Sequence, residues 1–146
     1  MESALGDATE EDVAFVPHDP AAQDDNERGW TIAHIVAHLT ATCEEGATIA
    51  SILARGAPPE GRPRYEVPWE TLTTLDQVRG RLAESRRMSN AYLAAWPDVP
   101  HLNHTHVLIP RFGPLNAIAR HAISLLHGQG HADQIAETVR QAHTQA

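Results

Sequence analysis

The chain of 146 residues contains no lysine and a single cysteine, Cys43. One cysteine excludes an internal disulfide framework and every zinc motif built from several cysteines. No apolar run approaches the roughly 20 residues that span a bilayer, so an integral membrane protein is not expected. The N-terminal segment MESALGDATEED is acidic and has no apolar core. It therefore argues against a secretory signal and for a cytoplasmic protein.

Basic residues are few and unevenly placed. The chain has 11 arginines against 19 acidic residues, and its net charge is −8 with histidine neutral. Nine of the acids precede Arg28, the first arginine, so no basic surface for nucleic acid is expected. The length favours one folded domain. We divide it into an acidic arm over residues 1–29, with at most a short helix capped by Thr9, and a folded body over residues 30–146.

Three long segments repeat apolar residues at helical spacing: residues 31–54, 75–96 and 114–141. Thr31 and either Thr73 or Thr74 are suitable caps for the first two, and Pro114 suits the first turn of the third. Prolines and glycines in residues 56–70 forbid a helix there, and the HTHVLI run could form a short strand. Nothing indicates a substantial sheet. The predicted fold class is therefore all-α, a small helical bundle.

Histidine is abundant, with ten copies, and two pairs lie four residues apart on predicted helices: His34 with His38, and His127 with His131. Residues so spaced lie about 40° apart on one helix face, with Cβ atoms about 6 Å apart. Two such imidazoles can bind one metal ion at about 2.0–2.1 Å. A single pair is a weak signal, and its ordinary alternative is two partly exposed side chains. Two pairs strengthen it, because bundles build metal sites from facing helices.

Several other histidine-containing sites do not fit the sequence. A zinc protease needs H-E-x-x-H, whereas the segments HIVAH and HGQGH contain no glutamate. The E-x-x-H repeats of di-iron bundles and the C-x-x-C-H of covalent haem are absent. The few aromatic residues disfavour a haem held between facing histidines. A mononuclear, all-imidazole site remains, which suits Zn²⁺, Ni²⁺, Fe²⁺ or Cu²⁺.

Four segments together resemble the DinB/YfiT-like superfamily. GWTIAHIVAHL is similar to its W-S/T-x-x-E-x-x-x-H-L segment and HGQGHADQI to its H-x-x-x-H-x-x-Q-I segment. LGDATEEDVAF and RFGPLNAIARH resemble its L-x-x-L-S-x-E-E-L entry and its G-x-x-T-x-x-E-L-L-x-H run. The resemblance covers nearly the whole chain from Leu5. It implies a four-helix bundle with a divalent metal ion bound by His38, His127 and His131, and it makes His34 an accessory residue at the pocket edge.

Two features depart from the family pattern. The family has a long helix before the L-S-x-E-E-L entry, whereas this chain begins almost at that entry, which leaves three long helices and a first helix that is short or missing. The groove left open should expose an apolar strip, and burial of that strip against a second copy predicts a homodimer. Gly128 and Gly130 each cost the third helix about 1 kcal/mol relative to Ala. They fit close approach by a helix or ligand, or merely a tolerated weak point.

Polar residues on two of the predicted helices are candidates for the walls of the site. Thr42 and Glu45 share the helix face of His38, and Glu45 could orient a ligand, act as a base, or be an ordinary surface carboxylate. Ser85 and Ser89 interrupt the apolar stripe of the second helix, where small polar side chains leave room for a ligand or permit close packing.

Charged and histidine side chains elsewhere are further candidates. Arg86 could contact an anionic substrate or belong to a solvated face. An HTH strand would place His104 and His106 on the same side, where they could relay a proton or hold a substrate. The alternative for both histidines is a surface loop.

A site with three histidines leaves positions for water or substrate, which is typical of catalytic zinc rather than structural zinc. Such a metal can lower the pKa of water or a thiol and can polarise a carbonyl. The resemblance implies related chemistry, since members include transferases that use low-molecular-weight thiols and thiol-dependent maleylpyruvate isomerases. We therefore predict a divalent-metal-dependent transferase, isomerase or lyase acting on a small molecule, with zinc or nickel favoured, iron next, and a thiol as candidate cosubstrate. The alternative is a non-catalytic stress protein that binds a metal or small ligand.

Overall fold

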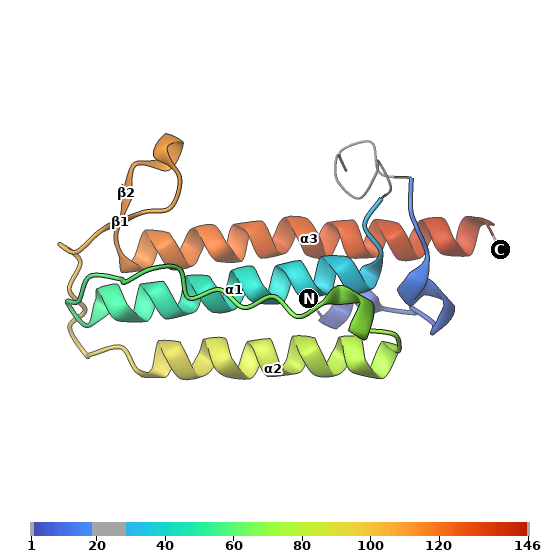
Figure 1. Ribbon diagram of the computed structural model, residues 1–146, viewed down its shortest axis with the longest axis horizontal. Coiled ribbons are helices and arrows are strands. Elements are labelled where there is room, and N and C mark those ends of the chain that lie inside the picture. Colours follow the sequence, from blue (N-terminus) through green and yellow to red (C-terminus); the bar gives the residue numbers. More distant parts are fainter. Residues whose placement is uncertain (1, 19–28, 146) are drawn as a thin grey trace.

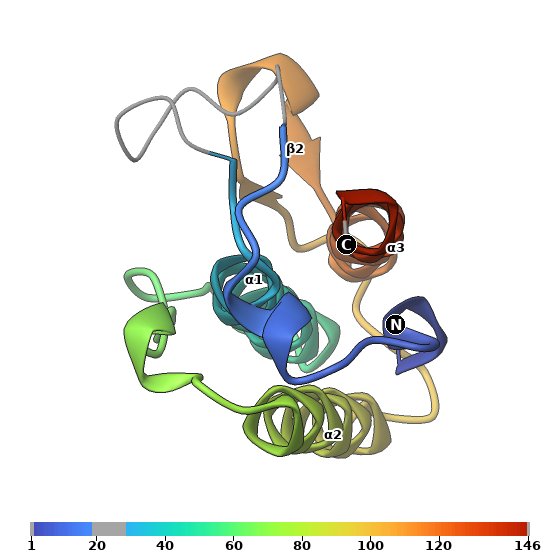
Figure 2. The same cartoon turned by 90° about the vertical axis from the view of Figure 1, so that its right-hand side faces the viewer.

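Three long α-helices form the body of the protein, in a computed structural model that describes residues 2–18 and 29–145. They are α1 (Ile32–Ala54), α2 (Leu75–Ala94) and α3 (Ala117–Gln145). Helix α1 lies in the middle, with α2 along one side and α3 along the other (Figure 1). Seen end-on, the three helices occupy the corners of a triangle (Figure 2). The predicted all-α bundle is confirmed. In the described ranges, none of the helices has both the length and the hydrophobicity needed to cross a membrane.

Short elements connect the helices. The described ranges contain four 3-10 helices: η1 (Glu2–Leu5), η2 (Glu11–Ala14), η4 (Trp69–Thr71) and η5 (Pro110–Phe112). Two short strands, β1 (His106–Val107) and β2 (Pro114–Leu115), pair antiparallel, and His106 lies opposite Leu115. The resulting hairpin stands beside the N-terminal half of α3 (Figure 1).

The ends of α1 and α2 follow their capping residues. The Thr31 side chain accepts the backbone N–H of His34, and Thr74 forms a capping box with Gln77. Gly56 follows α1 with a φ of 79°, a left-handed conformation that ends helices readily in glycine. The predicted caps are confirmed, and α2 ends at Ala94, two residues before the predicted end.

The predicted start of the third helix is wrong. Pro114 belongs to β2 instead of a first helical turn, because its strand pairs with residues that lie earlier in the chain. Helix α3 begins at Ala117, and the side chain of Asn116 accepts the backbone N–H of Ala119. Asn116 is thus the residue that satisfies a free donor at the start of the helix.

Part of the acidic arm packs into the core. Leu5, Ala8 and Val13 are buried in the cluster that contains the N-terminal half of α1. Thr9 does not cap η2 with its side chain; its backbone N–H donates to the carboxylate of Asp12, which also lies 3.0 Å from Nε2 of His143. These contacts tie the described part of the arm to the C-terminal end of α3.

The segment between α1 and η4 runs back along α1 without forming a helix (Figure 1). It passes over the α1 face that holds His38, Thr42 and Glu45, and its Arg62 and Arg64 reach that face. The α1 face between this segment and α3 is where the candidate site lies.

Candidate metal centre and adjoining cavity

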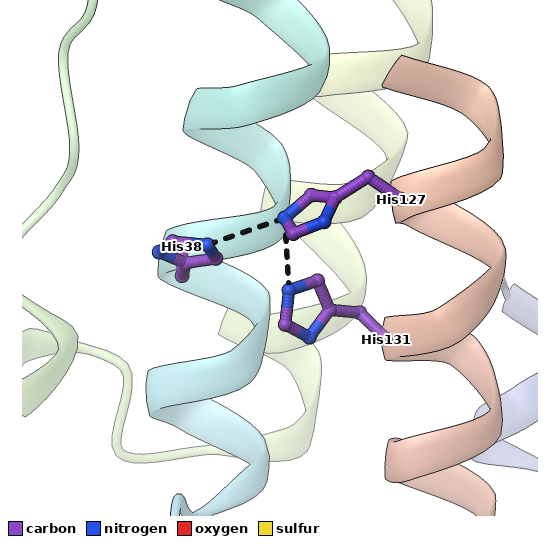
Figure 3. Close-up of side chains that lie close together, drawn as sticks. All are labelled: His38, His127 and His131. Carbon is purple, nitrogen blue, oxygen red and sulfur yellow. Dashed lines mark hydrogen bonds between the residues drawn. The ribbon is translucent and has the colours of Figure 1, made fainter. Parts of the chain in front are cut away.

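Three imidazole rings point toward one another between α1 and α3 (Figure 3). His38 comes from α1, and His127 and His131 come from successive turns of α3. The Nε2 atom of His127 lies 3.4 Å from Nε2 of His38 and 3.1 Å from Nε2 of His131. Ligand nitrogens about 2.0–2.1 Å from a tetrahedral metal ion are separated by roughly 3.3 Å. The three residues could therefore hold one metal ion.

Two neighbours orient His131. Its Nδ1 atom lies 2.9 Å from the side-chain oxygen of Gln134, one turn further along α3. A proton on Nδ1 that is donated to this oxygen leaves Nε2 as the atom with a free lone pair. The indole of Trp30 stacks on the same imidazole at an interplanar angle of 10°. Gln134 thus fixes the tautomer, and Trp30 fixes the ring plane.

The environment of His38 keeps its imidazole neutral. The pKa of His38 is lowered to about 4, mainly by burial and next by the nearby His131, whereas Glu66 acts in the opposite direction. Nδ1 of His38 lies 3.4 Å from Nη2 of Arg64 and 3.8 Å from the carboxylate of Glu66. Burial also lowers the pKa of His127. A neutral imidazole is the form that binds a metal ion.

His34 lies outside the trio. Its ring stacks between Trp30, at 4.4 Å between centroids, and Trp69, at 5.2 Å. The indole of Trp30 therefore stacks on His34 as well as on His131. This arrangement places His34 as a support for the indole that packs on a candidate ligand.

A cavity of about 790 Å³ adjoins the trio, with His38 and His127 in its wall. The other lining residues come from α1, the returning segment, the hairpin and α3: Thr42, Glu45, Arg62, Arg64, Glu66, Leu108, Ile109, Arg111, Phe112, Arg120, Ile123, Ser124 and Leu126. A space of this size suits an organic molecule. Its apolar residues come mainly from the hairpin and α3, and its charged residues mainly from α1 and the returning segment.

Glu45 is buried in this wall and paired with arginines. Its carboxylate accepts from Nε of Arg62 at 2.7 Å and from Nη1 of Arg64 at 3.4 Å. Burial raises the pKa of Glu45, but hydrogen bonding and charge from the arginines lower it by more, so the net pKa lies below its ordinary value. A carboxylate with a low pKa is a weak base. The contacts favour a role in holding Arg62 and Arg64 over a role as general base.

Replacement of Glu45 by Gln is expected to reduce stability by about 2 kcal/mol at pH 7, because it leaves guanidinium groups close together without their carboxylate. The estimate is below that for a fully buried pair because Arg62 is largely exposed. The folded-state pKa of Glu45 is lowered, so its contribution is present above the unfolded pKa and is lost as pH falls below about 4.5. Chemical denaturation at pH 7 and pH 3.5 should show a difference that shrinks in acid. An equal difference at both pH values would contradict this account.

The structure does not bring all predicted residues to the site. Ser85 is buried and donates to the carbonyl of Thr40 at 3.4 Å, so it serves close packing of α2 on α1. Ser85, Ser89 and Arg86 all belong to α2 and are not among the described residues that line the cavity. Thr42 does line it, and its hydroxyl accepts from Nη1 of Arg64 at 2.8 Å.

His104 and His106 are likewise not among the lining residues. Only His106 belongs to β1, whereas His104 precedes the strand and lies edge-on to His101, at 6.0 Å between ring centroids. Burial lowers the pKa of His106, Arg120 lowers it further and Glu45 raises it, which places His106 within electrostatic reach of the cavity wall. Its Nδ1 atom has no hydrogen-bond partner in the described ranges.

Sequence reasoning missed the arginines of the cavity, although the sequence contains one signal for Arg62 and Arg64 and another for Arg120. Arg62, Arg64 and Glu66 alternate in the R-x-R-x-E segment, a spacing that puts three charges on one side of an extended chain. Arg120 precedes His127 by seven residues and so shares the helix face of the metal candidates.

A comparison with protein families identifies the chain. The model of the DinB superfamily matches residues 1–135, and the chain belongs to this superfamily. The resemblance inferred from the four sequence segments is confirmed. Neither curated proteins nor solved structures gave a match.

Proposed function

We propose that this DinB superfamily member is a divalent-metal-dependent enzyme, with His38, His127 and His131 as the metal ligands and the adjoining cavity as the substrate site. The observation that supports it best is the convergence of three Nε2 atoms at the wall of a cavity large enough for an organic molecule. A bound divalent ion with three protein ligands would lower the pKa of a water or thiol, or polarise a carbonyl. Zinc or nickel is the favoured ion, and iron is next.

The chain's own residues would bind and orient the substrate. Arg64 connects two parts of the wall, since it contacts Thr42 and Glu45 on α1 and pairs with Glu66 on its own segment. Phe112 and Ile123 contribute apolar surface to the cavity wall, against which the apolar part of a substrate would pack. This open, charged cavity supports an enzyme of the transferase, isomerase or lyase type better than the alternative of a binding protein without turnover.

The finer proposal is that a low-molecular-weight thiol is the cosubstrate. Titration of cobalt-loaded protein with 2-mercaptoethanol is then expected to produce a sulfur-to-cobalt charge-transfer band, which should strengthen as pH rises because the thiolate is the ligand form. Ethylene glycol, which has oxygen in place of sulfur, serves as the matched control and should produce no band. Absence of a response to every thiol tested would remove the thiol from the proposal and leave a metal-dependent lyase or a binding protein.

We also propose that the protein forms a homodimer. Helix α3 exposes Ile118, Leu125 and Leu126 by 52%, 57% and 73%. Ile118 and Leu125 are two turns apart and share a helix face, and Leu126 lies about 100° around the helix from Leu125. Apolar side chains grouped in this way are typical of association surfaces. Leu126 also lines the cavity, so a partner on this face would cover the cavity rim.

Sedimentation equilibrium at micromolar concentration is expected to give about twice the chain mass of 15.9 kDa. Leu125→Glu should return the chain mass, because it places a charge in the apolar contact. Val99→Glu is the matched control, since Val99 is 82% exposed in the loop after α2 and lies outside this face. A wild-type protein that sediments at the chain mass would contradict the dimer.

A further inference from the structure

The cavity beside the three histidines has an excess of positive charge. Four arginines line it against two glutamates, Glu45 and Glu66, although the whole chain has a net charge of −8. Both glutamates are paired with arginines of the returning segment. The arginines that remain are Arg111, at the hairpin, and Arg120, on the inner face of α3.

Arg120 is the least solvated of these cations. It is 1% exposed, and its Nη1 atom donates to the hydroxyl of Ser124 at 2.6 Å. Its Nε atom has no hydrogen-bond partner among the residues that the structure describes. Glu45 attracts this guanidinium electrostatically, but its carboxylate hydrogen-bonds to Arg62 and Arg64, and no ion pair joins it to Arg120 in the described ranges. The side-chain partner that Arg120 does have is a neutral hydroxyl, and burial of a guanidinium is costly without a hydrogen-bonded anion.

The fold makes room for this side chain. A Cβ atom at Gly46 of α1 would lie 3.0 Å from Nη1 of Arg120 and 1.9 Å from the Ser124 hydroxyl. Glycine in the middle of α1 therefore leaves the space that the guanidinium and its hydroxyl partner occupy. A residue that is enclosed in this way, at a cavity wall and short of partners, has the properties of a ligand-binding group.

We propose that Arg120 binds an oxyanion of the substrate, a carboxylate or a phosphate on an organic molecule. The planar guanidinium matches both groups in geometry and charge. The cavity is far larger than a free inorganic anion, and Phe112, Ile123 and Leu126 offer apolar surface to the rest of the molecule. The inference rests on the proposed function only in that the other end of the substrate would lie at His38 and His127.

Isothermal titration of the full chain, freed of metal by chelation, tests this subsite independently of the metal. Phenylacetate and phenyl phosphate are expected to bind at least about tenfold more tightly than neutral phenylacetamide. Arg120→Met should remove this preference and leave the affinity for phenylacetamide unchanged. Arg140→Met is the matched control, because Arg140 lies on the same helix and pairs with Glu137 at the surface. The stronger of the two anions identifies the carboxylate or the phosphate as the group that is recognised.

Two results would overturn the proposal: equal affinity for the amide and both anions, or an unchanged preference in Arg120→Met. If Arg120→Met does not fold, the Nε–H resonance of Arg120 in the wild type decides. This resonance should shift on titration with an anion and stay unchanged with the amide. A resonance that is unchanged by both anions would contradict the subsite. Because the titration uses metal-free protein, its outcomes can be interpreted even if the assignment of the metal ligands is wrong.

Discussion

Replacement of His38, His127 or His131 by alanine is expected to reduce the metal content of the purified protein from about one ion per chain to almost none. The Nε2 atom of His127 lies 3.4 Å from that of His38 and 3.1 Å from that of His131, and the candidate ligand atoms of all three lie within 4.8 Å of one another, so removal of one residue leaves two protein ligands. Gln134→Ala should have a smaller effect, a loss of about 10–100-fold in affinity, because Gln134 orients His131 without binding the ion itself. Elemental analysis and competition with a chromophoric chelator measure the two effects.

His34→Ala is the matched control for these variants. It removes an imidazole that is four residues from His38 but stacks between Trp30 and Trp69, outside the trio. Its metal content should therefore stay close to that of the wild type. Circular dichroism shows whether each variant keeps its helices. A folded His38→Ala protein with the metal content of the wild type would contradict the assignment of the ligands.

The parts of the fold that depend on local sequence were predictable. The apolar spacing and the caps at Thr31 and Thr74 identified α1 and α2 because helices are determined largely by residues within one or two turns. The start of α3 was not predictable from local sequence, because Pro114 pairs with Val107 across a hairpin. A proline that suits a first helical turn also suits a strand edge, and only a contact with a distant part of the chain decides between them.

The site, like the fold, has some features that local sequence predicts and others that it does not. Spacing alone gave the pairs of histidines, and the family resemblance was needed to join His38 to His127 and His131. The sequence did not decide whether Glu45 lies in the pocket or at the surface. The returning segment covers its helix face, and that segment has no periodic pattern from which its position could be predicted. The cavity arginines were missed for the same reason: their role depends on segments that are far apart in sequence and meet only in the folded chain.

Gly46→Ala is expected to destabilise the protein by about 3 kcal/mol, despite the better helix propensity of alanine. The new Cβ atom would lie 1.9 Å from Oγ and 2.6 Å from Cβ of Ser124, across the contact between α1 and α3. The Ser124 hydroxyl has little freedom to move, because it accepts from Arg120 at 2.6 Å. Thermal unfolding followed by circular dichroism should show a midpoint lowered by about 10 °C.

Two further variants separate crowding from a general effect of the substitution. Gly80→Ala on α2 adds a Cβ atom with no heavy atom within 4 Å, so it should raise stability by about 1 kcal/mol. Ser124→Gly removes the two atoms closest to the new Cβ and leaves Nη1 of Arg120 at 3.0 Å. The double variant Gly46→Ala with Ser124→Gly should therefore be more stable than the sum of the single effects by more than about 1 kcal/mol. Strictly additive effects would mean that α1 and α3 do not meet at this point. The same contact encloses the Arg120 guanidinium, so in Gly46→Ala the preference of the cavity for anions should weaken together with the fold.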